Sequence, residues 1–68
     1  MNDANEALME LLIMGTFTYQ ELDAALRRTG TSQTWLFGNG MVVYCQDLIH
    51  LQVSDIGRAY LLKEIKHD

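Results

Sequence analysis

The chain has 68 residues, of which 49% are hydrophobic and 21% are charged, a balance that is typical of a folded globular protein and excludes a disordered chain. A chain of this length sustains one hydrophobic core, so residues 1–68 are expected to form a single domain. Nine acidic and five basic residues give a net charge of −4, which argues against a general binder of polyanions.

The first predicted element is a helix that begins at Ala4. Asp3 and Glu6 have the spacing of a capping box, in which the side chain of each residue accepts from the backbone N–H of the other. An apolar stripe with helical spacing follows, and Gly15 can adopt the left-handed conformation that ends a helix. The stripe comprises Leu8, Leu11 and Leu12.

A second helix is predicted from the strongest local signal in the chain. Thr18 and Glu21 make another capping box, and Phe17 and Leu22 have the spacing of a hydrophobic staple. Gly30 is expected to end this helix. The connection at residues 15–17 is short, so the two helices are predicted to be close neighbours.

Residues 31–40 allow two interpretations. Thr31 or Ser32 could cap a short helix that Gly38 ends, which is the interpretation we favour. Alternatively, residues 35–37 could form a strand that enters a tight turn at the glycines and joins a three-stranded sheet.

A β-hairpin is predicted next, with strands at residues 41–45 and 48–53 and a turn at residues 46–47. In the second strand, Ile49, Leu51 and Val53 share the face that is expected to be buried. Ser54 is then expected to cap a C-terminal helix. Its predicted apolar contacts are Ile56, Ala59, Tyr60, Leu62 and Ile65.

This order of elements resembles that of a small winged helix-turn-helix domain. Residues 7–26 resemble the opening helical pair of such domains. Residues 51–61 resemble the ending, in which the outer wing strand runs into a capped helix that carries a Gly-Arg pair. The resemblance implies an α+β fold of winged-helix type, with two N-terminal helices, a short helical turn, a β-hairpin and a C-terminal helix.

The resemblance also implies one function, DNA-binding transcription regulation, which we rank second. Arg27 and Arg28 would then contact phosphates, and the base edges would be met by Ser32, Gln33 and Thr34. The sequence departs from the winged-helix pattern because only residues 31–40 are available for a recognition helix. No Lys or Arg lies between Arg28 and Arg58, and the wing tip carries a carboxylate.

The function that we rank first is a non-enzymatic regulatory module that acts by protein–protein interaction. Trp35, Phe37 and Met41 cluster around flexible glycines, where they could either cap the core or form an exposed anchor for a partner. The first helix is apolar almost all round, so Met9 and Ile13 could face a protein partner or form a homodimer, or the hairpin and last helix could cover them. In size and character the chain is similar to phage and mobile-element regulators or inhibitors.

Enzymatic and ligand-dependent functions find no support in the sequence. Cys45, Asp47 and His50 are close in sequence, but Cys45 and His50 fall on opposite arms of the hairpin and no third group is evident to orient the imidazole. His67 completes no metal motif, so we expect no metal, no cofactor and no small-molecule substrate. No apolar run is long enough to cross a membrane and no signal peptide is evident, so a cytoplasmic location is expected.

Overall fold

The computed structural model describes residues 3–65, which form an α+β fold as predicted. Four helices and one antiparallel sheet make up the described residues. In chain order the elements are α1 (Asp3–Met14), β1 (Thr16–Phe17), α2 (Tyr19–Thr29), α3 (Gln33–Gly38), β2 (Val42–Tyr44), β3 (Leu51–Val53) and α4 (Asp55–Ile65).

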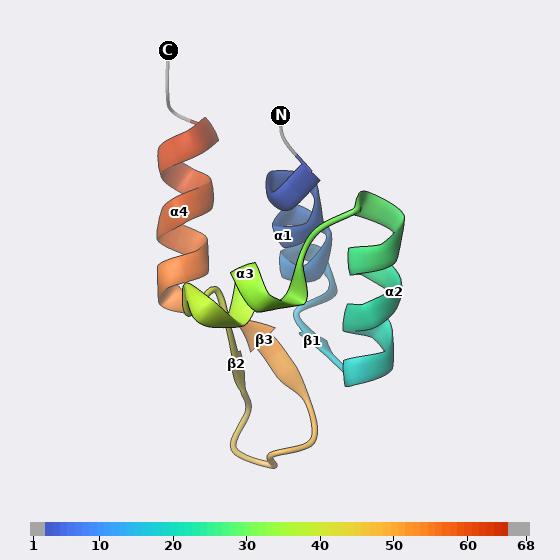
Figure 1. Cartoon of the computed structure of the whole chain (residues 1–68). Helices are drawn as coiled ribbons and strands as arrows, with labels where there is room; N and C mark the ends of the chain where they lie inside the picture. Colours follow the sequence, from blue (N-terminus) through green and yellow to red (C-terminus); the bar gives the residue numbers. More distant parts are fainter. Residues whose placement is uncertain (1–2, 66–68) are drawn as a thin grey trace.

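Figure 1 shows that α1 lies between α2 and α4, with α3 in front of the lower ends of α1 and α4. The hairpin of β2 and β3 projects away from the helices. The start of α1 and the end of α4 lie at the same end of the molecule, so these two helices run in opposite directions (Figure 1). This antiparallel arrangement positions the surface described below.

The ends of α2 follow the predicted local signals, and α1 begins close to its predicted start. α1 begins at Asp3, one residue before the predicted start. The backbone N–H of Glu21 donates to the Thr18 hydroxyl at 3.2 Å, and the Thr18 N–H donates to the Glu21 carboxylate at 2.9 Å, which confirms the capping box. α2 ends at Gly30, whose φ of 70° is left-handed and costs little without a Cβ.

The third strand of the sheet was not predicted. Thr16 and Phe17 were expected to be only a connection, but they pair antiparallel with Gln52 and Leu51, so the strand order is β1-β3-β2. Residues 33–38 form the short helix α3, which confirms the favoured interpretation of that segment. The Ser32 hydroxyl caps α3 by accepting from the Trp35 N–H at 3.3 Å.

The hairpin is present, but its loop is longer than the predicted two-residue turn. Cys45 N–H donates to the His50 carbonyl at 2.8 Å, and the Leu48 N–H donates back to the Cys45 carbonyl at 3.0 Å, so the chain turns before β3 begins. Leu48 has a φ of 61°, an uncommon conformation for a residue with a side chain. Ile49 therefore lies exposed in the loop, and its predicted place on the buried face with Leu51 and Val53 is wrong.

The core is formed by residues from every element of the fold. The largest fully buried side chains are Phe17, Leu8, Leu11, Leu22, Leu36 and Leu51. From α4 the buried side chain is Leu61, whereas Ile56, Ala59 and Leu62 are exposed and Tyr60 is half-buried, so the predicted apolar face of this helix is largely wrong. The side chain of Ile65 lies outside the described part of the chain.

The first turn of α4 is tied to the start of β2. The Ser54 hydroxyl accepts from the Gly57 N–H at 3.0 Å, which confirms its predicted capping role, and it donates to the Gly40 carbonyl. Ser54 N–H also donates to the Met41 carbonyl at 2.9 Å. Gly57 is buried against the Met41 carbonyl. Because Gly57 has no Cβ, α4 packs closer to the Met41 backbone than any residue with a side chain at position 57 would allow.

Candidate functional site

An apolar groove of about 370 Å³ lies between α1 and α4. We refer to it as the α1/α4 groove. It is lined by Met9, Leu12, Ile13, Arg58, Leu61 and Leu62. Ile13 is 83% exposed and Leu62 is 55% exposed, whereas Met9 packs partly against the core. Five of the six lining side chains are apolar, so the groove offers contact area to another apolar surface.

The groove exists because α1 carries more apolar residues than its core-facing side can hold. Ala7, Leu8 and Leu11 point into the core and are fully buried. Met9 and Ile13 are four residues apart, so they lie above one another on the flank of the helix, where Met9 still packs partly against the core and Ile13 is exposed. The structure therefore brings together the two residues that were predicted as a contact surface, and Ile13 is left uncovered by both the hairpin and α4.

The sequence did not identify the part of the groove that α4 contributes. Leu62 was predicted to be a core contact, and Arg58 was noted only as part of a Gly-Arg pair. The direction in which α4 faces is set by the close contact at Gly57 with the Met41 backbone, which lies sixteen positions earlier in the chain. No local pattern signals that contact.

The second predicted protein-binding cluster is largely part of the core. Met41 is only 6% exposed, so its predicted role as part of an exposed anchor is wrong. Its N–H donates to the Leu36 carbonyl at 2.9 Å and its carbonyl accepts from Ser54, which holds this residue between α3 and α4. The Met41 side chain is part of the core cluster.

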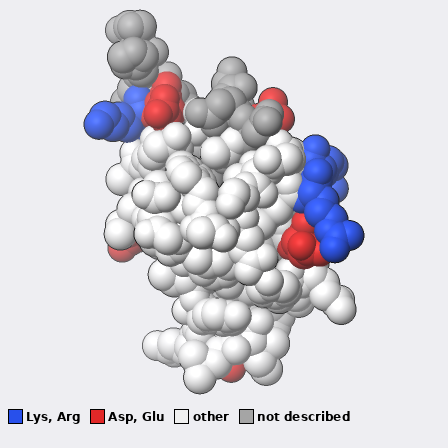
Figure 2. Space-filling model, in the orientation of Figure 1, with Lys and Arg blue, Asp and Glu red and all other residues white. Residues whose placement is uncertain are grey.

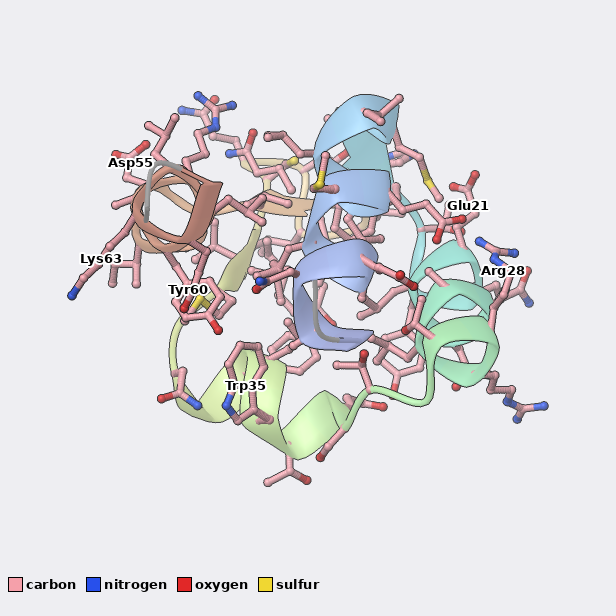
Figure 3. The ribbon with its side chains drawn as sticks, turned by 90° about the horizontal axis from the view of Figure 1, so that it is seen from above. Glu21, Arg28, Trp35, Asp55, Tyr60 and Lys63 are labelled. Atoms are coloured by element: carbon pink, nitrogen blue, oxygen red, sulfur yellow. The ribbon has the colours of Figure 1, made fainter. Side chains whose placement is uncertain are left out.

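Trp35 and Phe37 are half-buried and pack against the same core. The Trp35 ring meets the Tyr60 ring edge to face, with centroids 5.7 Å apart and planes at 70° (Figure 3). This is a favoured geometry for an aromatic pair and joins α3 to α4. The arrangement favours the core-capping interpretation of Trp35 and Phe37 over that of a free anchor.

The residues predicted for DNA contacts lie on two elements. Arg27 Nε is 3.1 Å from Asp23 Oδ2, and Arg28 donates to the Glu10 carboxylate on α1, so an acidic partner offsets the charge of each arginine. At the start of α3 the exposed residues are Ser32, Gln33 and Thr34. Figure 2 shows that the face of the molecule carrying α3 and the hairpin has its charged residues at the margins. This face offers no concentrated positive field for phosphates.

The Asp47 carboxylate organises the hairpin loop. One of its oxygens accepts from the N–H groups of Ile49 and His50, each at 2.9 Å, and the other lies 2.7 Å from His50 Nδ1. These hydrogen bonds lower the pKa of Asp47 from its ordinary value of 3.8 to about 2. The largest contribution comes from the His50 backbone N–H, and the next from the His50 side chain. Within residues 3–65 His50 Nδ1 contacts the Asp47 carboxylate, and no hydrogen bond joins the Cys45 thiol to the His50 ring.

The depressed pKa of Asp47 predicts a pH dependence of stability. A carboxyl group with a lower pKa in the folded state stabilises the fold above its unfolded pKa, and this contribution disappears as the pH falls from about 4 through about 2. We expect the free energy of unfolding of the wild type, measured by urea titration, to fall in this range. The Asp47→Asn variant should show a smaller fall. An equal fall in the free energy of unfolding between about pH 4 and about pH 2 in the two proteins would contradict the role given to Asp47.

No group of three or more His, Cys, Asp or Glu side chains within residues 3–65 is arranged to hold a metal ion. None of the helices described is both long and apolar enough to cross a membrane.

Comparison of the chain with protein-family models, with curated proteins and with solved structures finds no match.

Proposed function

We propose that the protein is a non-enzymatic regulatory module that binds another protein chain through the α1/α4 groove. The observation that carries this proposal is the exposure of Ile13 and Leu62 beside a groove whose floor is Met9 and Leu61. Exposed apolar side chains that gather on one continuous surface are characteristic of protein interaction sites, whereas isolated ones are ordinary. A regulator or inhibitor of phage or mobile-element type, acting in the cytoplasm, is the role that this surface fits.

The arrangement of elements supports the winged-helix resemblance as part of this proposal. The order helix, capped helix, short helix, hairpin and helix is the one that the resemblance implies, and the hairpin projects as a wing would (Figure 1). The recognition position is held by α3, which has six residues and contributes Leu36 to the core. A helix that short has little surface to place in a DNA groove, so fold alone does not favour DNA binding.

DNA binding remains the second candidate, with less support from the geometry. Arg27 and Arg28 already have acidic partners, and the loop at the wing tip carries the Asp47 carboxylate. A phosphate contact by either arginine would have to compete with its ion pair.

The first test compares two isoleucines that are both exposed on helices. Ile13 lines the groove, and Ile56, which is 60% exposed at the start of α4, does not. We expect Ile13→Gln to reduce capture of a protein chain by at least about tenfold, because truncating a central interface residue removes on the order of 1–2 kcal/mol of binding free energy. Capture should be measured with tagged protein from host lysate, with and without nuclease treatment, and Ile56→Gln should leave the capture of protein unchanged.

The same experiment separates the two candidate functions. Equal capture by both variants would overturn the groove as the binding surface. Recovery of DNA alone, lost on nuclease treatment and in the Arg27→Ala, Arg28→Ala double variant, would support the DNA-binding function instead.

A further inference from the structure

The geometry points to a second copy of this chain as the occupant of the α1/α4 groove. We propose a symmetric dimer in which α1 packs antiparallel against the partner's α1, and in which Arg58 meets the partner's Glu6. This inference rests on the proposed function, because it names the partner for the same surface.

The apolar part of the surface has both of the shapes that a self-complementary contact needs. Ile13 stands out from α1 with 83% of its surface exposed, directly beside the groove floored by Met9 and Leu61. In a two-fold contact the same patch is used by both copies, so each copy must offer a projection and a depression. Ile13 of one copy can enter the groove of the other, where it would contact the partner's Leu62.

The charges at the two ends of the surface are arranged as a two-fold contact requires. Glu6 and Ile13 are seven residues apart, so they lie on the same side of α1 and roughly two turns from one another. Arg58 lines the groove beside Ile13, and because α1 and α4 run antiparallel it lies at the opposite end from Glu6 (Figure 1). A two-fold axis through the middle of the groove exchanges the two ends. It therefore brings the cation of each copy to the anion of the other.

The Glu6 carboxylate and the Arg58 guanidinium are both accessible to a partner. Both Glu6 and Arg58 are exposed, and neither takes part in an ion pair within the described residues, unlike Arg27 and Arg28. A partner surface that carried charges of one sign would attract one of Glu6 and Arg58 and repel the other. A second copy of the chain offers the opposite charge to both. Burial of Ile13 and Leu62 would also add apolar contact to a chain of 68 residues, whose own core is small.

The test is a charge exchange across the proposed contact. The oligomeric state of the full chain should be measured by sedimentation equilibrium in low salt for wild type, Glu6→Arg, Arg58→Glu and the double variant. We expect wild type to dimerise, each single reversal to raise the dimer dissociation constant at least about tenfold, and the double variant to recover most of the loss. Lys63→Glu, a reversal on α4 outside the groove lining, should leave the constant unchanged.

The outcomes distinguish this inference from the proposed function. A wild-type chain that stays monomeric at about 1 mM would overturn self-association. If Ile13→Gln still abolished capture of a different protein, the groove would remain the binding surface. A dimer that is insensitive to both single reversals, or one that the double variant fails to restore, would overturn the antiparallel α1 arrangement.

Discussion

Replacing Gly57 by alanine is expected to lower the free energy of unfolding by about 3 kcal/mol, a large effect for the addition of one methyl group. A Cβ at this position would collide with the Met41 carbonyl oxygen and lie 2.7 Å from Val53 Cγ1. The obstructing carbonyl belongs to backbone that also accepts a hydrogen bond from the Ser54 N–H. α4 would therefore have to move away from β2 and β3 as a unit. Urea unfolding followed by circular dichroism measures the loss.

Gly38→Ala is the matched control for this substitution. Gly38 is the last residue of α3, and a Cβ there would meet nothing within 4 Å. Because alanine is the better helix former, we expect this variant to be unchanged or more stable by up to about 1 kcal/mol. A similar loss in both variants would contradict the close approach of α4 as the cause.

Replacing Phe17 by alanine is expected to cost about 3–5 kcal/mol, since it leaves a large cavity in the core. Phe17 is fully buried, and its backbone pairs with Leu51 in the two-residue strand β1. The next residue, Thr18, caps α2, so this position joins the sheet to the second helix. Loss of the ring should therefore destabilise both elements together, as a single cooperative transition at lower urea concentration.

Tyr44→Ala provides the comparison within the same sheet. Tyr44 also pairs with Leu51, but it lies on the other outer strand and its side chain is exposed. Its removal is expected to change the free energy of unfolding by less than about 1 kcal/mol. A loss at Phe17 as small as that at Tyr44 would show that the ring does not support the core.

The candidate site was foreseen only on the side that α1 contributes. An excess of apolar residues on one helix is visible in the sequence, and it led to Met9 and Ile13. The opposite wall, with Leu62 and the charge of Arg58, depends on how α4 is rotated about its own axis. That rotation follows from the packing of Gly57 and Leu61, which has no sequence signal of its own.

The interpretations of Met41 and Ile49 that the structure contradicts fail for the same physical reason. For Met41, the exposed-anchor alternative overlooked hydrogen bonds between its backbone and that of Leu36 and Ser54, which belong to two different helical regions. The burial expected for Ile49 assumed that the strand continued to the turn, whereas the Asp47 carboxylate closes a wider loop. In both cases hydrogen bonds that the residue pattern does not reveal decided the local conformation.

The sequence by itself determined the two ends of α2, the cap of α4 and that a hairpin precedes the last helix. These features depend on residues a few positions apart: Thr18 with Glu21, Ser54 with Gly57, and Gly30 with the carbonyl of Leu26. Hydrogen bonds of this kind form within one turn of chain, so the residue types at fixed spacing are sufficient to predict them.

Only the tertiary structure decided which apolar residues are buried and which remain as a surface. β1 has two residues and acquires its strand conformation by pairing with residues 51 and 52, far along the chain. The α1/α4 groove likewise exists only because two helices from opposite ends of the described chain lie side by side. Burial is a property of what packs against a residue, and for these residues the packing partners are distant in sequence.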